Sequence, residues 1–271
     1  MPEPLTQAEW LARVPEHVAD LAASWGLTPG EAYPPGAAGY ALRVELEDAT
    51  PAVLKVSNPH REASQEADAL ERWDGDGAVR LLARDDARNA MLLERCEPGT
   101  FLSASAAGDT LGVLIGLLPR LWKSGEGFAT LEDEAAIWSD EIAREARDPT
   151  LRDAALGYLR ELPSTQGEQV LLHQDLHGEN VLAAEREPWL VIDPKPLAGE
   201  REFSLAPIVR SFELGHSKRA ALYRLDRLTS ELGLDRERAL GWTVAQTVAW
   251  SGGSDYWDVH VDTVRWLLED A

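Results

Sequence analysis

Three polar residues of one stretch, Asp175, Asn180 and Asp193, have the types and the order that phosphoryl transfer requires. They follow two short apolar runs, 170–172 and 189–192, which we interpret as buried β-strands that end in loops. A loop carboxylate can take the proton of an attacking hydroxyl, while an amide oxygen and a second carboxylate suit a hard cation. We therefore predict that Asp175 is the catalytic base and that Asn180 and Asp193 bind Mg²⁺ beside the phosphates of ATP. Each residue alone would also be typical of an ordinary turn, so the prediction depends on their spacing.

Two histidines beside Asp175 leave a second metal assignment open. His173 and His177 form a His-x-Asp-x-His pattern that would suit zinc. A zinc hydrolase usually takes further ligands from elsewhere, but the remaining histidines form no spaced cluster. They are His17, His60, His216 and His260. We favour a His173 that hydrogen-bonds the loop backbone over a zinc site.

A lysine in an apolar strand and a glutamate in the following helix form a second candidate pair. The run AVLKV, 52–56, predicts a strand whose alternation leaves Lys55 on the face opposite its apolar neighbours. An isolated buried ammonium is costly, so we expect a partner from the predicted helix 60–73. That helix offers Glu62, Glu66 and Glu71. We choose Glu66, because a strand lysine paired with a helix glutamate positions the α- and β-phosphates of ATP in kinases.

The segment before this strand is rich in turn residues. Residues 29–39 contain PPGAAG and precede an alternating run, 40–46, that predicts a strand. Backbone amides around Gly36 and Gly39 could cover phosphates, although such clusters are most often simple turns.

A break in the pattern at Glu97-Pro98-Gly99-Thr100 follows two further predicted strands, 79–83 and 90–94. We place the boundary between two lobes there. Residues 1–97 would form a nucleotide-binding lobe, and residues 98–271 a helical lobe with the catalytic loop and the acceptor site. The backbone of Glu94 and Cys96 could hydrogen-bond the adenine edge, so both are predicted to contact the cofactor.

Helical periodicity accounts for most of the remaining chain. A first helix, 4–26, would end at Gly26. Ser103 is the predicted N-cap of a helix that runs to Leu121, and Asp235 caps a later one. The other predicted helices span 131–147, 150–162, 203–214, 217–232, 235–251 and 255–269.

Composition and charge narrow the classes of protein. The 271 residues include 26 Lys and Arg against 47 Asp and Glu, a formal charge of −21. Such a charge disfavours binding to nucleic acid and anionic membranes and favours binding of a cationic small substrate. An acidic surface also maintains solubility, which could be its whole purpose. No apolar run reaches the roughly 18 residues of a membrane span, and the first residues carry charge and proline. We expect a cytoplasmic monomer, with the single cysteine in a packing role.

The motifs HQDLHGENVL and VIDPKPLAGE resemble those of the aminoglycoside phosphotransferases, and more narrowly the streptomycin 6-kinase (aminoglycoside/hydroxyurea kinase) group. AVLKV, LLERCEPGT and GWTVAQTV add to the resemblance, which covers about residues 50–250. It implies an α+β, two-lobed, protein-kinase-like fold with an ATP site between the lobes. It also implies that Asp175 is the base, that Asn180 and Asp193 hold Mg²⁺, and that Lys55 and Glu66 contact ATP.

Two positions depart from this family pattern: Gln174 and Glu179 stand where glycine is usual. The acceptor is therefore the least determined feature. We expect an aminoglycoside of the streptomycin type. The alternatives are hydroxyurea, another small hydroxylated metabolite, or a non-catalytic relative that only binds nucleotide.

Three further features bear on the substrate. Lys195 could neutralise phosphate charge or pair with Glu200, and the sequence does not choose between them. Late tryptophans could hold a cation, although most should be core; they are Trp242, Trp250, Trp257 and Trp266. Carboxylates of the C-terminal half could attract a polycation; they are Glu202, Glu213, Asp255, Asp258 and Asp262.

Overall fold

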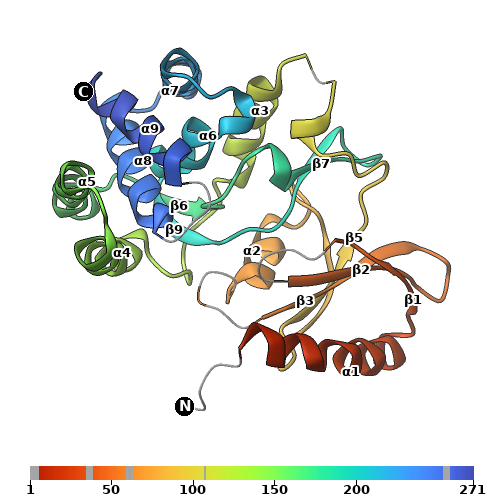
Figure 1. Cartoon of the computed structure of the whole chain (residues 1–271). Helices are drawn as coiled ribbons and strands as arrows, with labels where there is room; N and C mark the ends of the chain where they lie inside the picture. The colour runs from red at the N-terminus through yellow and green to blue at the C-terminus, as the bar shows by residue number, and fades with distance from the viewer. Residues whose placement is uncertain (1–5, 35–38, 59–60, 62–63, 107, 253–256) are drawn as a thin grey trace. The chain divides into compact units, whose positions relative to one another are not determined.

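The computed structural model describes residues 6–34, 39–58, 61, 64–106, 108–252 and 257–271. The chain divides into two compact units (Figure 1). The first unit comprises Met1–Gly99 and Ala183–Ile192, and the second comprises Thr100–Leu182 and Asp193–Ala271. Each unit is described by itself below.

The first unit is built on a five-stranded antiparallel sheet in the order β1-β2-β3-β5-β4. The strands are β1 (Thr28–Ala32), β2 (Gly39–Glu45), β3 (Pro51–Ser57), β4 (Leu81–Asp85) and β5 (Ala90–Glu94). The register places Lys55 of β3 opposite Ala41 of β2 and Met91 of β5. Lys55 therefore lies in the central strand, where its position is constrained from both sides. The second helix of the unit is α2 (Glu66–Trp73).

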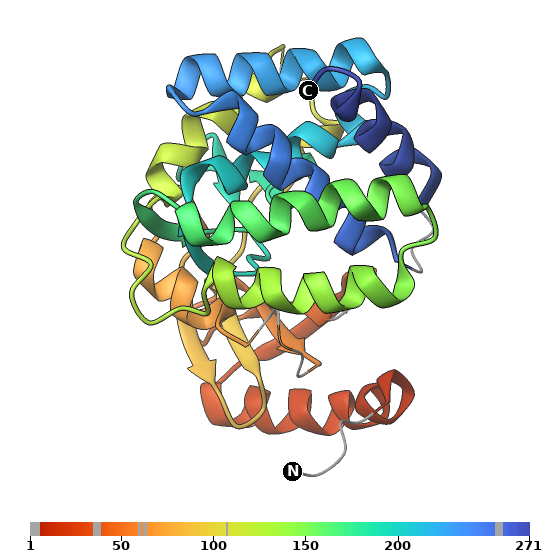
Figure 2. The same ribbon diagram turned by 90° about the vertical axis from the view of Figure 1, so that its left-hand side faces the viewer.

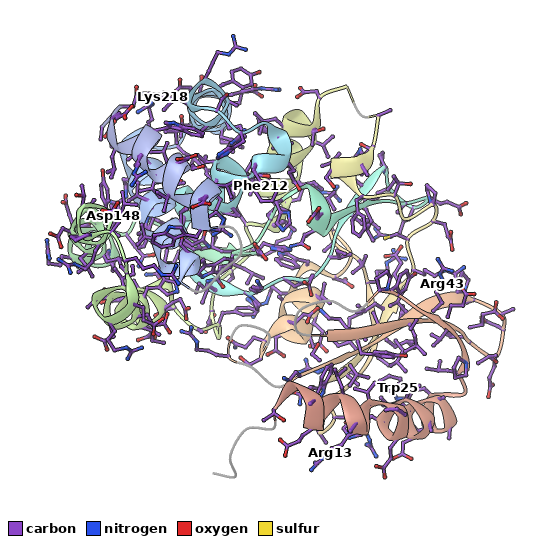
Figure 3. The ribbon with its side chains drawn as sticks, in the orientation of Figure 1. Arg13, Trp25, Arg43, Asp148, Phe212 and Lys218 are labelled. Atoms are coloured by element: carbon purple, nitrogen blue, oxygen red, sulfur yellow. The ribbon has the colours of Figure 1, made fainter. Side chains whose placement is uncertain are left out.

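Helix α1 (Gln7–Trp25) covers this sheet through an apolar stripe (Figure 1). Thr6 and Glu9 form a capping box at its start, and Gly26 ends it with φ 63°. Trp25 packs against the core of the unit whereas Arg13 is exposed (Figure 3). The helix continues through Pro15. The predicted first helix is thus confirmed.

The prediction of a turn-rich segment over residues 29–39 is partly wrong. Thr28–Ala32 forms the edge strand β1, in which all five residues are exposed, so the sequence carries no alternation there. Pro29 is tolerated because an edge strand leaves one row of backbone groups unpaired. Gly36 lies outside the described residues. Helix α2 begins at Glu66 rather than near residue 60, and the candidate Glu62 also falls outside the described residues.

The segment 183–192 belongs to the first unit although it follows residues 100–182 of the second unit in sequence. Val79 N donates to Val191 O at 3.0 Å, and Val191 N donates to Gly77 O at 2.9 Å. Strand β8 (Trp189–Val191) is thereby joined to the backbone just before β4. The boundary is predicted after residue 97, and the first segment of the first unit ends at Gly99, before Thr100 of the second unit. The functions assigned to the two lobes stay a prediction.

The second unit is mainly helical. Its helices are α3 (Thr110–Leu121), α4 (Leu131–Glu145), α5 (Pro149–Glu161), α6 (Ala206–Arg210), α7 (Lys218–Leu232), α8 (Arg236–Ser251) and α9 (Trp257–Leu268). Figure 2 shows α4 and α5 in green beside the blue helices of the C-terminal part. Helix α8 packs against α5, α6 and α9, and most of its side chains are buried. It therefore forms the centre of this unit.

Two short strands flank the loop that carries Asp175 and Asn180. Strand β6 (Gln169–Leu172) pairs antiparallel with β9 (Leu197–Glu200), and β7 (Val181–Ala183) follows the loop. Strand β9 was not predicted, because all four of its residues are buried and the run is too short to show alternation. The predicted buried strand at 170–172 is confirmed as part of β6.

Two helix predictions are wrong, one in the position of the N-cap and one in the continuity of the helix. Leu102–Ala104 forms a 3₁₀ turn, and the N-cap of α3 is Asp109, whose carboxylate accepts from Gly112 N at 3.0 Å, instead of Ser103. The predicted helix 203–214 is divided into a 3₁₀ turn, α6 and a second 3₁₀ turn, Phe212–Leu214. The predicted cap at Asp235 is confirmed. None of the helices in the described part of the chain has the length and apolar composition to cross a bilayer.

Candidate active site

The loop after β6 begins with a residue in the left-handed region of backbone space. Gln174 has φ 65°, although a side chain disfavours that conformation. Gln246 of α8 donates from Nε2 to the Gln174 carbonyl oxygen at 2.9 Å, and Lys195 N donates to the His173 carbonyl oxygen at 3.0 Å. Glutamine thus adopts the torsion that glycine would favour, and the bonds to its carbonyl and to its neighbour hold it there.

His173 accepts a hydrogen bond from the Asp175 backbone N at its Nδ1, at 3.3 Å. The predicted backbone role of His173 is therefore confirmed. Among the described residues, a different trio, His177, Glu179 and Glu213, brings one ligand atom each within 4.8 Å of one another. Because Nδ1 of His173 is turned to its own loop, the His-x-Asp-x-His zinc alternative has no support from this geometry.

Asn180 closes the loop on Asp175. It lies at the end of a 3₁₀ turn, Gly178–Asn180, and its Nδ2 donates to the Asp175 carbonyl oxygen at 2.8 Å. Within the described part of the chain, its Oδ1 accepts no hydrogen bond, which leaves that oxygen for a cation. A Cβ on Gly178 would lie 2.6 Å from Glu213 Oε1 and 3.0 Å from Ser103 N, so only glycine fits there.

The Asp175 carboxylate lies between two cations. Lys195 Nζ is 2.9 Å from Oδ2, and Arg210 Nη2 is 3.3 Å from Oδ1. Burial alone would raise the pKa of Asp175, but Lys195 and Arg210 outweigh burial and hold this pKa below its usual range. Asp175 is therefore ionised at neutral pH, which is the state that a general base requires.

Lys195 has a partner that the sequence did not suggest. Of its two predicted roles, pairing with Glu200 is wrong, because Glu200 is held by Arg238 at 2.7 Å and by Trp242 Nε1. Glu200 ends β9 and is buried, so its charge needs a close partner, which the Arg238 guanidinium supplies. Lys195 forms its ion pair with Asp175 instead. Its role toward phosphate stays a prediction.

Arg210 was missed by sequence reasoning. It ends α6, 35 residues after Asp175, and no motif marks it. Its guanidinium carbon lies 4.5 Å from the centroid of the Trp250 ring, and Lys195 Nζ lies 4.6 Å from the same centroid. Of the late tryptophans, Trp250 therefore does hold cations, but they are the protein's own. Trp242 is core, against Phe203.

His177 links Asp175 to a second carboxylate. Its Nε2 is 3.9 Å from Asp175 Oδ1, and its Nδ1 is 3.6 Å from Glu213 Oε2. Burial lowers the pKa of His177, but Glu213 and Asp175 outweigh burial and raise it. Glu213 lies in the 3₁₀ turn that starts at the half-exposed Phe212 (Figure 3). Since Glu213 also accepts from Gly178 N, it fixes the loop rather than facing solvent alone.

Asp193 is the first residue of the second unit after β8. It is exposed and has φ 58°, so its carboxylate follows an unusual backbone turn. Its role as a Mg²⁺ ligand stays a prediction.

The predicted partner of Lys55 is confirmed. In the first unit Lys55 Nζ lies 2.6 Å from Glu66 Oε1, and both side chains are largely buried. A Cβ on Gly39 would lie 3.3 Å from Lys55 Cε, so the glycine permits β2 to approach the lysine stem. The contact of this pair with ATP stays a prediction.

Glu94 and Cys96 have structural side chains. The Glu94 carboxylate accepts from Arg186 at 2.8 and 3.0 Å and from Arg80 N at 3.0 Å. Burial would raise the pKa of Glu94, but Arg186 outweighs it and lowers the pKa. Cys96 is buried, and burial raises the pKa of its thiol to about 12. These contacts leave only the backbone of this segment for adenine, and that role stays a prediction.

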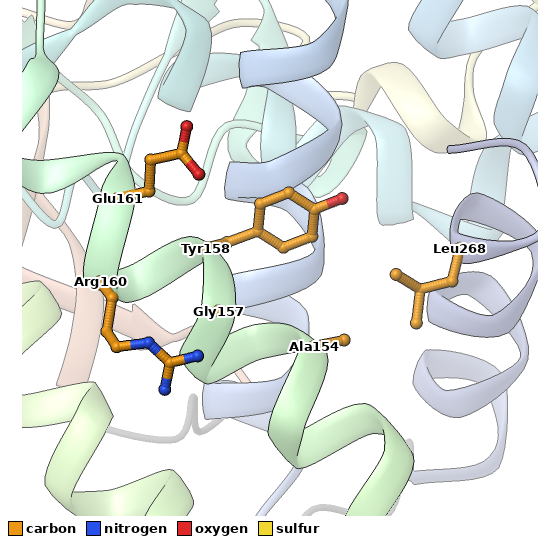
Figure 4. A pocket seen from close by; sticks show the side chains of 6 residues that line it. All are labelled: Ala154, Gly157, Tyr158, Arg160, Glu161 and Leu268. Atoms are coloured by element: carbon orange, nitrogen blue, oxygen red, sulfur yellow. The ribbon is translucent and has the colours of Figure 1, made fainter.

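A shallow hollow lies on the surface of the second unit. Five residues of α5 and Leu268 of α9 line it (Figure 4). None of them belongs to the predicted site, so we assign no substrate to this hollow.

An antiparallel sheet with a buried Lys–Glu pair, and a helical unit with an Asp-x₄-Asn loop, define a kinase-like phosphotransferase. The chain matches the aminoglycoside/hydroxyurea antibiotic resistance kinase family over residues 24–258, and it belongs to that family. The predicted family is thereby confirmed.

Two curated relatives and one solved structure give the detail. The chain is 38% identical over 264 residues to a streptomycin 6-kinase of Streptomyces glaucescens, covering 92% of this chain and 84% of the relative. It is 40% identical over 253 residues to a hydroxyurea phosphotransferase of Kitasatospora aureofaciens, covering 89% and 73%. A thermostable mutant of the aminoglycoside phosphotransferase APH(4)-Ia, solved with ADP and hygromycin B, superimposes with a TM-score of 0.66 and 11% identity over 93% and 96% of the two chains. At that identity the likeness is one of fold, and it confirms the predicted fold class.

Proposed function

We propose that this protein is an ATP-dependent kinase that phosphorylates a hydroxyl group of an aminoglycoside of the streptomycin type. The observation that carries the proposal is the Asp175 carboxylate, ionised at the end of β6 with Lys195 and Arg210 on its two oxygens. The relative of this name shares 38% identity over most of both chains and supports the substrate class.

Each candidate residue has one task in this reaction. Lys55, held by Glu66, binds the phosphates of ATP. The donor set of Asn180 and Asp193, one neutral oxygen and one carboxylate, fits Mg²⁺, which supplies charge neutralisation on the phosphates when bound. Asp175 orients the acceptor hydroxyl and receives its proton.

The charge of the chain supports a cationic acceptor. The formal charge is −21, and aminoglycosides are polycations at neutral pH. Of the carboxylates considered for this purpose, Glu213 is engaged by His177 and Gly178, Asp262 lies 3.6 Å from His216, and Asp255 falls outside the described residues. The long-range field of the chain, rather than one carboxylate, would attract the acceptor.

A second acceptor is supported by the 40% identity to the hydroxyurea phosphotransferase. Hydroxyurea is neutral, so the salt dependence of KM distinguishes it from a cationic aminoglycoside. The test is to measure ATP consumption with streptomycin, other aminoglycosides, hydroxyurea and choline, and to identify the product by mass spectrometry. We expect the product to be a phosphorylated aminoglycoside. The KM for the aminoglycoside should rise as the salt concentration rises from about 0.02 to 0.3 M, because screening shortens the reach of surface charge. Turnover of hydroxyurea alone, with a salt-independent KM, would reject the aminoglycoside.

Nucleotide binding without turnover of any acceptor would instead favour the non-catalytic alternative. The matched control for every acceptor is Asp175→Asn, which should bind ATP and consume it about 10³-fold more slowly than the wild type.

A further inference from the structure

The two cations on Asp175 differ in how firmly the protein holds them. Arg210, on Oδ1, has a side chain that is 9% exposed, whereas Lys195, on Oδ2, has a side chain that is 26% exposed. The lysine bond is the shorter of the two, at 2.9 Å against 3.3 Å. Burial, rather than distance, decides which cation can leave, because an ion that moves must be solvated along its way.

Arg210 is held in place by its surroundings. It ends α6, a fully buried helix of the second unit, and its guanidinium lies against the Trp250 ring. Asp175 supplies its only ion pair within the described part of the chain, where Arg210 Nη1 also has no hydrogen-bond partner. Moving Arg210 away would leave its buried guanidinium without an ionic partner and would remove one of the two cations on Asp175. Oδ1 of Asp175 therefore stays occupied.

Lys195 is the cation that can move. It lies on the segment between Asp193 and β9, and its flexible side chain reaches Oδ2 with the ammonium over the Trp250 ring. A partly exposed ammonium exchanges one anionic partner for another at low cost, since water and a new partner replace the lost bond. In this arrangement each oxygen of Asp175 contacts one cation, and the contact with the partly exposed lysine is released at the lower cost.

We propose that Arg210 is a positioning residue that keeps Oδ1 of Asp175 engaged, so that Oδ2 is the oxygen that receives the proton, and that Lys195 moves from Oδ2 to the transferred phosphoryl group. The inference rests on the proposed kinase function. The acceptor hydroxyl gives its proton to Oδ2 while its oxygen forms a bond to the γ-phosphorus. The bond from the γ-phosphorus to the bridging oxygen breaks, and ADP leaves with the electron pair. Lys195 then faces the three phosphoryl oxygens, where negative charge concentrates.

Trp250 has a defined part in this arrangement. Its ring lies 4.5 Å from the Arg210 guanidinium carbon and 4.6 Å from Lys195 Nζ. A flat aromatic face can hold a guanidinium in one plane while an ammonium moves along it. Phenylalanine would keep such a face and leucine would not.

The first test distinguishes the roles of Lys195 and Arg210 by measuring the nucleotide affinity of variants at each position. In Lys195→Met we expect the affinity for a non-hydrolysable ATP analogue to fall about tenfold and the affinity for ADP to stay within about twofold, because only the analogue has a γ-phosphoryl group. Arg210→Met should change neither affinity by more than about twofold. An unchanged ratio of the two affinities in Lys195→Met would overturn the role of Lys195. Titration calorimetry on the full chain measures both, and it needs no acceptor.

The second test uses turnover. Arg210→Met should lower kcat about 100-fold while the KM values for ATP and acceptor stay within about threefold, since a misplaced base affects only the chemical step. Trp250→Leu should lower kcat about tenfold in the same manner, and Trp250→Phe should restore most of it. If Arg210→Met does not fold, the Trp250 pair decides: equal kcat in Trp250→Leu and Trp250→Phe would reject the positioning role.

The outcomes also separate this inference from the proposed function. Wild-type turnover of an aminoglycoside with unaffected variants would leave the kinase standing and remove the roles of Lys195 and Arg210. A wild-type protein without any acceptor, but with the tenfold loss of analogue affinity in Lys195→Met, would keep Lys195 at the phosphoryl group and reject the acceptor class.

Discussion

Lys55 Nζ lies 2.6 Å from Glu66 Oε1, and the two side chains are 14% and 3% exposed. The pair joins the central strand of the sheet to α2, so each charge depends on the other for its burial.

Glu66→Gln should therefore destabilise the protein and weaken ATP binding together. Removing one charge of a buried pair weakens the compensation of the other charge, for which we expect a loss of about 2–4 kcal/mol in the free energy of unfolding. The matched control is Glu71→Gln in the same helix, whose carboxylate is more than half exposed and 3.4 Å from Arg84; it should lose less than about 0.5 kcal/mol. Urea unfolding and the KM for ATP measure the two effects. Equal stability of the two variants would contradict the prediction.

Asp175→Asn should lose most turnover and keep nucleotide affinity. The amide cannot accept the hydroxyl proton and does not attract Lys195 or Arg210 as an anion does, so kcat should fall about 10³-fold. Asp153→Asn, an exposed change on α5, serves as the control and should leave kcat unchanged. Steady-state kinetics with the identified acceptor and calorimetry with ATP give both quantities. Near-wild-type turnover in Asp175→Asn would remove Asp175 from the chemistry.

Asp193→Ala should act on the metal rather than on the proton. Loss of a charged oxygen ligand should raise the Mg²⁺ concentration for half-maximal activity about tenfold or more, and Asn180→Ala should do so to a smaller extent. Removal of Mg²⁺ with EDTA should abolish turnover in the wild type, and added Mg²⁺ should restore it. Activity that persists in EDTA would show that the two oxygens have another purpose.

His260 should make the protein less stable in acid. Burial, with a smaller contribution from Arg210, lowers the pKa of His260 to about 4. The unfolded chain therefore binds this proton more readily, so stability is complete above about pH 6.5 and falls as the pH drops toward 4. The loss attributable to His260 should be on the order of 2 kcal/mol at pH 4.5.

Urea unfolding at several pH values tests the last prediction, because His260→Asn removes the titration. The variant should lose less stability than the wild type between pH 6.5 and 4.5, whatever its stability at neutral pH. Parallel pH curves for the two proteins would show that His260 is not held neutral by the fold.

The sequence by itself determined the chemistry-bearing groups and the elements that carry them. Lys55 in an apolar strand, Glu66 in the following helix and the spacing of Asp175 and Asn180 are local features. The end of α1 at Gly26 and the cap at Asp235 are local as well, because capping and periodicity involve residues within one or two helical turns. Family membership followed from the same motifs.

Only the tertiary structure decided which side chains surround Asp175. The sequence could offer Glu200 to Lys195, but the burial of Glu200 beside Arg238 and Trp242 gives Lys195 to Asp175 instead. The pairing of β6 with β9 and the edge strand β1 likewise depend on partners distant in sequence. Arg210 and Trp250 are 35 and 75 positions from Asp175, and no motif connects either residue with it. Their convergence results from the packing of α6 and α8, and the energy of a buried ion pair depends on such neighbours rather than on the sequence around each charge.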